Sequence, residues 1–315
     1  MVVDAHSHVF PEPRGLVREG PTRDGGYGRM RVGERLMQLL PPFNQRTEFT
    51  TEMLLANLDW AGVDAAVLLQ GTFYGECDGY VAEAVAANPG RLVGALWCDP
   101  WRPGFRRYFE EQVEGGVFAA GKIELSEETG LTGVHPGARL DDEEAGWLWP
   151  ALEARGMALT LDLGPPAQEA YQTEAVRAIA EAHEGLSVVI THLAHPRIDD
   201  EADPELRRRR DEQLALGELP NVWFDFASFP AILAGREEFP YPTAARWLRE
   251  GLERLGADRV MWGTDQPGML SHLNYDQLLR LARLHTRHLP ARDQALVLGE
   301  TARRVYFGER KGEDG

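Results

Sequence analysis

Eight short apolar or β-branched runs, each followed by an amphipathic stretch of helical length, predict an α/β protein formed by a single (β/α)8 (TIM) barrel. Because strand and helix alternate strictly, the strands are expected to be parallel with right-handed crossovers, and eight such units close into a barrel. The length of 315 residues suits this fold. No stretch has the composition of a linker, so we expect one domain over residues 1–315.

The predicted strands are short runs dominated by valine, isoleucine and leucine, and the segments between them have helical periodicity. In residues 173–183, the positions i, i+3, i+4 and i+7 counted from Val176 form one face of a helix. Thr173 is available to cap the start of this helix, and Gly185 to end it. The eight strands are expected at residues 2–5, 64–70, 91–98, 117–125, 157–163, 187–192, 221–226 and 259–264.

Residues 11–49 interrupt this regular pattern directly after the first strand and are rich in glycine, proline and arginine. We expect them to form a long loop at the C-terminal mouth of the barrel, because that is where the first strand ends. Loops of this length are usually functional or disordered. With Phe43 and seven arginines, the segment is either a lid or anion-recognising wall of an active site, or a partly ordered surface excursion.

A run of four arginines, Arg207–Arg210, lies among acidic residues at positions 203, 205, 211 and 212. The surrounding pattern predicts a helix. Charges of both signs at helical spacing are typical of a solvated, salt-bridged face. We therefore expect such a face here rather than a binding patch.

The overall charge excludes several classes of partner. The chain has 33 basic and 50 acidic residues, a net charge of −17 that repels nucleic-acid phosphates and anionic lipid surfaces. Cys77 and Cys98 cannot form a disulfide framework, and the N-terminus lacks the pattern of a signal peptide. No apolar run approaches the roughly 20 residues that cross a bilayer. We expect a soluble cytoplasmic protein that binds a small molecule, with a homodimer as the default oligomer.

The most informative local motif is Asp4-Ala5-His6-Ser7-His8, at the end of the first predicted strand. Alternate residues of a strand point the same way, so His6 and His8 project into one space as a pair of candidate metal ligands. A His-x-His motif can also be a pair of surface histidines without a function. A strand end favours function here, because barrel enzymes place their catalytic groups at these ends.

Two further strand ends supply matching groups. The sixth predicted strand ends in His192, and the eighth ends in Asp265, where Pro267 stops it. Strands 1 and 8 are neighbours in a closed barrel, so Asp265 can face His6 and His8 across the mouth. Three nitrogens and one oxygen suit zinc or a similar borderline cation and leave positions open for water and substrate.

Together, the Asp-x-His-x-His opening, His192 and the Trp-Gly-Thr-Asp-x-Pro sequence around Asp265 resemble the amidohydrolase-related proteins. That group includes lactonases and decarboxylases of the aminocarboxymuconate-semialdehyde type. The resemblance runs the length of the chain and includes residues 58–64 and 89–91. It implies a distorted TIM barrel that hydrolyses a C–O or C–N bond of a small cyclic or aromatic-derived molecule, with Asp265 as metal neighbour and general base.

One position departs from those members of the group that carry a full set of metal ligands. They commonly have a histidine at the end of strand 5, whereas this sequence has Asp162 and is more similar there to the lactonase-like branch. Asp162 is a candidate metal ligand, or a hydrogen-bond acceptor for His192 or for substrate. Some lactonases of the group work without a metal, so metal-free operation stays an alternative to a zinc or manganese site.

Three more polar side chains are candidate substrate contacts. Lys122 and Glu124 lie two residues apart on the fourth predicted strand and therefore share a face. Because burying them unpaired is costly, we expect them in the polar mouth, with an ion pair between them as the preferred interpretation. Glu124 is also a candidate bridging metal ligand. His195 follows His192 by three residues and is a candidate substrate contact, with a structural role as the alternative.

We expect metal-dependent hydrolysis of a lactone, in which the three histidines fix a cation that lowers the pKa of water, and Asp265 takes the proton. The metal or His192 stabilises the oxyanion, and Lys122 or an arginine of residues 11–49 holds a substrate carboxylate. Two alternatives are open: nonoxidative decarboxylation, in which Asp265 protonates carbon, and a barrel that only binds a ligand. The fold alone does not separate them.

Overall fold

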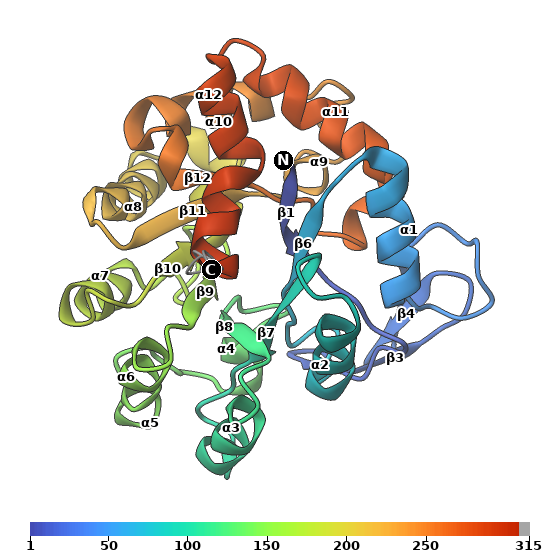
Figure 1. The fold of residues 1–315 in the computed structure, drawn as a ribbon, viewed down its shortest axis with the longest axis vertical. Helices are drawn as coiled ribbons and strands as arrows, with labels where there is room; N and C mark the ends of the chain where they lie inside the picture. Colours follow the sequence, from blue (N-terminus) through green and yellow to red (C-terminus); the bar gives the residue numbers. More distant parts are fainter. Residues whose placement is uncertain (309–315) are drawn as a thin grey trace, which may run out of the picture.

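The structure is a computed structural model that describes residues 1–308. Its centre is a nearly closed barrel of eight parallel strands that follow one another in chain order, which confirms the predicted fold (Figure 1). Seven strands lie within their predicted ranges, and the first extends to Ser7, because this residue pairs with Leu68 and Gln266. The strands are β1 (Val3–Ser7), β6 (Ala65–Leu68), β7 (Leu92–Trp97), β8 (Phe118–Glu124), β9 (Ala158–Asp162), β10 (Val188–Ile190), β11 (Val222–Phe226) and β12 (Val260–Trp262).

Helices alternate with the strands and form the outer layer (Figure 1). The helix predicted at 173–183 is present as α7, but its caps are Gln172 and His183, so the expected roles of Thr173 and Gly185 are wrong. No helix within residues 1–308 is long and apolar enough to cross a membrane. The longer helices are α1 (Thr51–Ala61), α2 (Asp78–Ala87), α3 (Phe105–Val113), α6 (Leu148–Glu153), α7 (Thr173–Ala182), α8 (Pro204–Leu214), α10 (Pro242–Leu255) and α11 (Tyr275–Thr286).

The remaining helices are short. They lie in the loops between strands or near the C-terminal end, where the chain also contains two π-helical turns. They are α4 (Leu131–Val134), α5 (Glu143–Gly146), α9 (Phe229–Ile232) and α12 (Ala291–Ala295).

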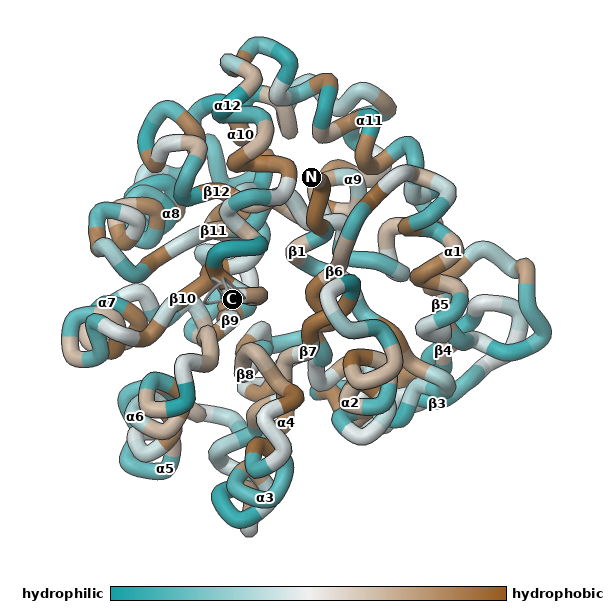
Figure 2. The backbone as a smooth tube through the Cα atoms, viewed as in Figure 1, coloured by the Kyte–Doolittle hydropathy of each residue, from teal (hydrophilic) through white to brown (hydrophobic). Residues whose placement is uncertain are grey.

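The apolar residues form two layers, one inside the barrel and one between strands and helices. Small side chains such as Ala5, Ala95 and Ala120 fill the inside, where there is little room for larger ones. The C-terminal segment brings Tyr306 against this inner layer, with its hydroxyl 2.8 Å from Thr160 Oγ1. Figure 2 shows hydrophobic residues gathered on the strands and hydrophilic ones on the outer turns. Tyr306 thus fills the end of the barrel opposite the strands' C-terminal mouth.

Asp4 joins the first and last strands at the barrel seam. Its buried carboxylate accepts hydrogen bonds from the Thr264 amide (2.9 Å), Thr264 Oγ1 (2.6 Å), Tyr275 OH (2.8 Å) and Ser7 Oγ (2.6 Å). A buried donor that loses its acceptor costs about 1–3 kcal/mol, so an apolar side chain at position 4 would leave several such losses. Asp4 therefore closes a seam that has few strand-to-strand hydrogen bonds.

Residues 11–49 do not form the expected loop. Residues 16–38 contain a four-stranded antiparallel sheet of β2 (Leu16–Val17), β3 (Gly20–Asp24), β4 (Arg29–Val32) and β5 (Arg35–Gln38). Its turns rely on glycine: Gly20 and Gly33 have φ of 121° and 55°, where a side chain is strained. Thr22 Oγ1 donates to Phe73 O at 2.9 Å and so anchors the sheet to the loop after β6. Phe43 is 86% exposed.

Candidate active site

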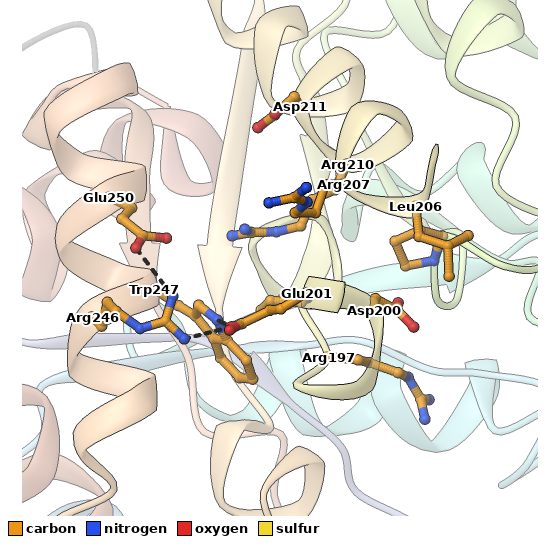
Figure 3. Close-up of a pocket in the computed structure, with 12 residues that line it drawn as sticks. Arg197, Asp200, Glu201, Leu206, Arg207, Arg210, Asp211, Arg246, Trp247 and Glu250 are labelled. Atoms are coloured by element: carbon orange, nitrogen blue, oxygen red, sulfur yellow. Dashed lines mark hydrogen bonds and ion pairs between the residues drawn. The ribbon is translucent and has the colours of Figure 1, made fainter. Parts of the chain in front are cut away.

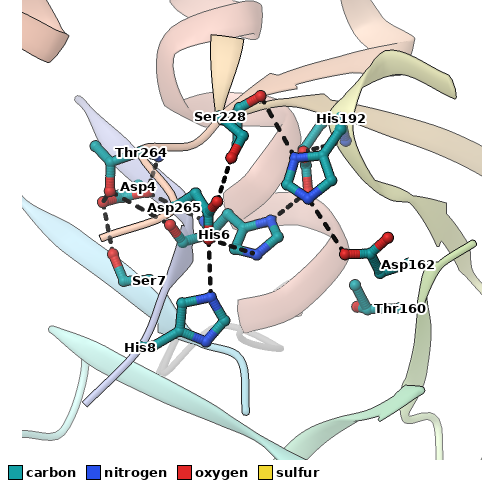
Figure 4. Close-up of polar contacts among 12 residues, drawn as sticks. Asp4, His6, Ser7, His8, Thr160, Asp162, His192, Ser228, Thr264 and Asp265 are labelled. Carbon is teal, nitrogen blue, oxygen red and sulfur yellow. Dashed lines mark hydrogen bonds and ion pairs between the residues drawn. The ribbon is translucent and has the colours of Figure 1, made fainter. Parts of the chain in front are cut away.

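The first two candidate ligands lie at the C-terminal end of β1. His6 and His8 are both buried, and their ring centroids are 5.1 Å apart. Asp265 follows β12 across the seam and points its carboxylate at both rings (Figure 4). Its Oδ1 lies 3.0 Å from His8 Nε2 and 3.6 Å from His6 Nε2. The alternation of the strand and the closure of the barrel thus bring these three side chains together, as the sequence predicted.

Main-chain hydrogen bonds across the seam hold this geometry. The Asp265 amide donates to the His6 carbonyl and the His8 amide to the Gln266 carbonyl, each at 2.7 Å. Asp265 has φ of 60°, in the left-handed region that aspartate and asparagine tolerate better than most residues. This backbone turn aims the carboxylate back over β1 instead of continuing the strand. Asp265 is therefore placed by the barrel seam itself.

His192 joins the cluster from a different kind of backbone than the sequence predicted. β10 ends at Ile190, and His192 lies in the following 3-10 turn (Thr191–Ala194), so its expected place as the last residue of a strand is wrong. Its φ of 57° turns the ring inward, where it stacks on His6 with centroids 5.0 Å apart. His192 Nε2 lies 3.3 Å from Asp162 Oδ2. The turn, and not the alternation of side chains along a strand, therefore positions His192.

Asp225, near the C-terminal end of β11, belongs to the cluster although no sequence motif marks it. Its Oδ2 lies 3.0 Å from His6 Nδ1, and its Oδ1 accepts a hydrogen bond from the His192 amide at 2.8 Å. A carboxylate on Nδ1 holds a proton on that nitrogen and orients the ring so that Nε2 faces Asp265. A signal was present in the sequence: an acid within an apolar strand needs a partner, because burying it unpaired is costly.

Two more residues of the site were missed. Ser228, after β11, donates its hydroxyl to Asp265 Oδ2, which leaves Oδ1 for the histidines. Tyr74 packs its ring 4.8 Å from that of His8, and burial together with the charges of Asp265 and Glu124 raises its pKa well above the ordinary value. Its hydroxyl therefore stays protonated. No periodicity or motif marks either residue, because both lie in loops.

Lys122 and Glu124 do not form the expected ion pair. Glu124 accepts hydrogen bonds from Thr129 Oγ1 (2.7 Å) and Ser126 Oγ (3.5 Å), and within residues 1–308 Lys122 pairs with no carboxylate. The reason is local: the loop after β8 folds back and supplies hydroxyl donors to Glu124. Burial and the charge of Asp162 raise the pKa of Glu124 to about 7. The ammonium of Lys122 is left without a partner carboxylate.

The protonation states follow from burial and from these partners. Burial would raise the pKa of Asp265, but the hydrogen bond from His8 and the charges of His6 and His192 hold it well below its ordinary value. Burial lowers the pKa of His8 to about 4. At neutral pH Asp265 is therefore a carboxylate and His8 a neutral imidazole, the forms that accept a proton and bind a cation.

The pKa values of His192 and His195 are shifted in opposite directions. Burial would lower the pKa of His192, but the hydrogen bond and charge of Asp162 prevail and raise it to about 9. Its partner Asp162 has a pKa well below the ordinary value. Burial lowers the pKa of His195 to about 3. The charge of His192 adds to this effect, because the two rings lie 5.1 Å apart. A cation at His192 would displace its proton, because ligation requires a neutral imidazole.

The chemistry of the donor set fits a divalent cation. Candidate ligand atoms lie within 4.8 Å of one another in three groups. His8 Nδ1 is buried and has no hydrogen-bond partner within residues 1–308, so that ring is not fully engaged by the protein. Imidazole nitrogens with carboxylate oxygens suit zinc, with manganese as an alternative. The groups are His6–His8–Asp265, His6–His192–Asp225 and Asp162–His192–His195; Glu124 belongs to none of them.

Imidazoles and a carboxylate thus converge at the C-terminal mouth of a (β/α)8 barrel, where barrel enzymes place their catalytic groups. The chain belongs to the amidohydrolase family, whose sequence model matches residues 3–308. Among curated proteins, none matches the sequence.

Solved structures of similar fold share low sequence identity with this chain. One is an amidohydrolase from Burkholderia multivorans with bound zinc (19% identity, TM-score 0.70, covering 98% of this chain and 99% of that one). Another is a proposed 2-pyrone-4,6-dicarboxylic acid hydrolase from Pseudomonas putida (21% identity, TM-score 0.67, covering 98% of this chain and 98% of that one). A third is 5-carboxyvanillate decarboxylase from Sphingomonas paucimobilis (20% identity, TM-score 0.54, covering 80% of this chain and 82% of that one). At such identities the likeness establishes the fold.

Proposed function

We propose that this amidohydrolase is a metal-dependent lactonase that opens a small cyclic ester bearing a carboxylate. The observation that carries the proposal is the environment of Asp265. One carboxylate oxygen faces two imidazoles and the other is held by Ser228, so the carboxylate is oriented at a site where imidazoles converge. A proton acceptor fixed beside a cation site is an arrangement that supports metal-assisted hydrolysis of an ester.

His6, His8, His192 and Asp265 are the residues that would hold the cation. When bound, the cation would supply a Lewis acid that polarises the scissile carbonyl and promotes ionisation of water. Asp225 fixes the orientation of His6, since it accepts the Nδ1 proton of that ring. The 2-pyrone-4,6-dicarboxylic acid named for the similar fold from Pseudomonas putida is a cyclic ester with carboxylates, which agrees with the proposed substrate class.

Asp265 acts as the general base. It accepts a proton from the attacking water and returns it to the alkoxide that leaves when the ring opens. The low pKa of this carboxylate keeps it ionised before the reaction. Tyr74, whose hydroxyl stays protonated beside His8, is placed to donate a hydrogen bond to negative charge that develops on the carbonyl oxygen.

Lys122 is the proposed anchor for the substrate carboxylate. Its side chain is 2% exposed, and within the described chain its ammonium has no carboxylate partner. Such a charge is costly to bury unless an anion joins it. A carboxylate on the lactone provides that anion and orients the ring against Asp265.

The test combines elemental analysis with turnover of a panel of small lactones, with and without a carboxylate. We expect about one equivalent of zinc or manganese, and activity that chelation removes and the metal restores. Full activity in protein without metal would contradict the role of the cation. Release of carbon dioxide from an aromatic acid, with no lactone opened, would instead make the protein a decarboxylase.

Replacing the base gives a sharper result. Asp265→Asn keeps a residue type that tolerates the left-handed backbone there, but asparagine cannot accept the proton, so kcat should fall by roughly 100- to 10,000-fold. Asp99→Asn, which alters a carboxylate paired with His135 at 3.0 Å, is the matched control and should retain activity. Metal content measured on both variants separates loss of the base from loss of the cation. Unchanged kcat in Asp265→Asn would refute this mechanism.

A further inference from the structure

The run of arginines on α8 has its charge balanced by acids. Arg208 pairs with Glu205 and Glu212 along its own helix, as the expected salt-bridged face requires. Arg210 differs, because its Nε and Nη2 atoms are buried beside a pocket between α8 and α10 (Figure 3). The expected solvated face is therefore correct for Arg208 and wrong for Arg210. The carboxylates that act on the guanidinium of Arg210 belong to Glu201, Asp211 and Glu250.

The segment 11–49 has a different neighbour, because it lies against the loop that carries Tyr74. This loop follows β6 and turns at Gly71, whose carbonyl accepts hydrogen bonds from the amides of Tyr74 (3.2 Å) and Gly75 (3.0 Å). The ring of Tyr74 contacts those of His8 and Phe10, with centroids 4.8 Å and 4.7 Å away. A small shift of the loop would therefore move the hydroxyl of Tyr74 relative to His8.

Three consecutive carbonyls of this loop accept hydrogen bonds from the segment 11–49. Two of the donors are main-chain amides and the third is a side-chain hydroxyl. The hydroxyl can therefore be removed by a substitution that leaves the backbone donors in place. The three bonds are Leu16 N to Thr72 O (3.2 Å), Thr22 Oγ1 to Phe73 O (2.9 Å) and Arg14 N to Tyr74 O (2.9 Å).

The segment and the loop approach each other so closely that glycine is needed at the contact. A Cβ atom on Gly15 would lie 2.2 Å from Thr72 O and 2.5 Å from Phe73 O. On the side of the loop, a Cβ atom on Gly75 would lie 2.4 Å from Arg14 O. Because glycine has no Cβ, the two backbones can pack directly on each other. The position of the loop is thus coupled to that of the segment.

Thr22, on β3, joins these contacts through one hydroxyl group. Its buried side chain donates to Phe73 O and accepts a hydrogen bond from the Gly15 amide at 2.6 Å. The Thr22 amide also donates to Gly15 O, at 2.9 Å. Valine has nearly the same shape but neither donates nor accepts, so it would leave both partners of the hydroxyl unpaired. The hydroxyl of Thr22 therefore links the small sheet to the loop of Tyr74.

We propose that Thr22 is a positioning residue that holds the hydroxyl of Tyr74 at the catalytic cluster, so that the small sheet β2–β5 serves the reaction as a support for that loop. This inference rests on the role proposed for Tyr74, which donates a hydrogen bond to negative charge on the carbonyl oxygen. A displaced donor stabilises that charge less, because a hydrogen bond weakens as its distance and angle depart from their optimum.

Kinetics on a carboxylated lactone test the proposal. Tyr74→Phe should lower kcat by roughly 100-fold, as expected for the loss of an oxyanion donor. Thr22→Val should lower kcat by roughly tenfold with little change in KM, because it displaces this donor without altering the groups that bind the substrate carboxylate. In the double variant the decrease should equal that of Tyr74→Phe alone, since Thr22 acts through Tyr74. Decreases that multiply would overturn the proposal.

Further variants separate positioning from a loss of stability. Thr22→Ser keeps the hydroxyl and should retain most of the wild-type kcat. Thr47→Val is the matched control, because Thr47 is a buried threonine of the same segment whose Oγ1 donates to Arg29 O at 2.6 Å, outside the loop of Tyr74. An equal decrease in Thr47→Val and Thr22→Val would show that Thr22 only stabilises the fold. If melting curves show that Thr22→Val does not fold, Thr22→Cys, whose thiol is a weak donor, replaces it.

A spectroscopic measurement decides the proposal without turnover. The tilted ring of Tyr74 shifts the imidazole proton signals of His8 in nuclear magnetic resonance spectra of the full-length protein. At equal metal content, Thr22→Val should move these signals in the direction seen in Tyr74→Leu, whereas Thr47→Val should leave them unchanged. Unchanged signals in Thr22→Val would overturn the proposal. Shifted signals in a protein that opens no lactone would support the positioning and contradict only the proposed function.

Discussion

At the residue scale, the site depends on side chains that hold other side chains. His6 is fixed through Nδ1 by Asp225 and presents Nε2 to Asp265, while Ser228 orients Asp265 from its other oxygen. His192 gains its position from a run of left-handed residues, His192–His195, with φ between 50° and 59°. Such backbone costs of order 1–3 kcal/mol per residue and persists where the surroundings enforce it, often at functional sites.

The support from Asp225 gives the first prediction at this scale. Asp225→Asn should weaken zinc affinity by roughly 10- to 100-fold, because His6 loses the carboxylate that fixes its tautomer and basicity. Competition with a chromogenic chelator measures the affinity, and circular dichroism verifies the fold. Asp99→Asn again serves as the control. Zinc affinity equal to that of the wild type would mean that Asp225 has only a structural role.

Lys122 gives the second prediction at the residue scale. Lys122→Met keeps a long unbranched side chain in the buried position but removes the charge, so KM for a carboxylated lactone should rise roughly tenfold or more. The KM for an uncharged lactone of the same ring size should change little, because that substrate has no carboxylate to hold. Steady-state kinetics on the two substrates measure the difference. An equal loss on both would show that Lys122 acts on the fold and not on substrate binding.

At the scale of the elements, polar groups buried between helices and strands connect the layers. Asp78, at the start of α2, accepts a hydrogen bond from the Trp97 amide at the end of β7 (3.0 Å) and from Tyr108 OH on α3 (2.8 Å). Burial raises the pKa of Asp78 to about 7, because these donors and Arg102 only partly offset the loss of water. Asp78 thus ties three elements together at the expense of burying a carboxyl group.

This raised pKa predicts the pH dependence of stability. The folded state holds the Asp78 proton more tightly than the unfolded state does, so the contribution to stability is present below about pH 4 and is lost as pH rises through 7. Asp78→Asn cannot ionise. Relative to wild type, its free energy of unfolding should therefore improve by about 3 kcal/mol between pH 5 and pH 8, at 1.4 kcal/mol per pH unit.

Urea denaturation at both pH values measures this change. Asp59→Asn, which alters an exposed carboxylate paired with Arg91, is the control and should show little pH-dependent difference. A difference between Asp78→Asn and wild type that stays constant from pH 5 to pH 8 would contradict the raised pKa.

The small antiparallel sheet β2–β5 shows how short strands can escape prediction from composition. β2–β5 bury Val17, Met30 and Val32, which belong to the same apolar core as the residues between strands and helices. Its strands are two to five residues long and contain proline and arginine, which conceals the alternating pattern. Composition therefore predicted a loop where pairing between short strands produces a sheet.

At the scale of the whole molecule, the candidate cation site connects distant parts of the chain. Its candidate ligands come from positions 6 to 265 and meet where the first strand closes on the last. A cation that binds these residues only when they are assembled stabilises the folded state. Metal binding and barrel closure should therefore be coupled.

Metal removal tests this coupling. At a free zinc concentration of 100 times the dissociation constant, the free energy of unfolding should exceed that of the chelated protein by about 3 kcal/mol. Melting curves with and without zinc measure the gain. A His6→Asn, His8→Asn double variant should lose the response to zinc, and a response that persists in it would place the cation outside the proposed cluster.

Much of the barrel and of the cluster was determined by the sequence alone. Strands and helices follow from local periodicity, and a closed barrel of parallel strands gathers all strand ends at one mouth, so His6, His8, His192 and Asp265 could be expected to meet. The motifs that resemble the family include the same residues, and the family model matches residues 3–308.

Only the tertiary structure decided which groups pair. Asp225 meets His6 across 219 positions of sequence, Glu124 turns to hydroxyl donors instead of Lys122, and Arg210 faces a pocket while Arg208 pairs along its helix. The physical reason is that periodicity specifies the face on which a side chain lies, whereas the partner of a buried charge depends on distances of a few ångströms between segments that only the folded chain brings together.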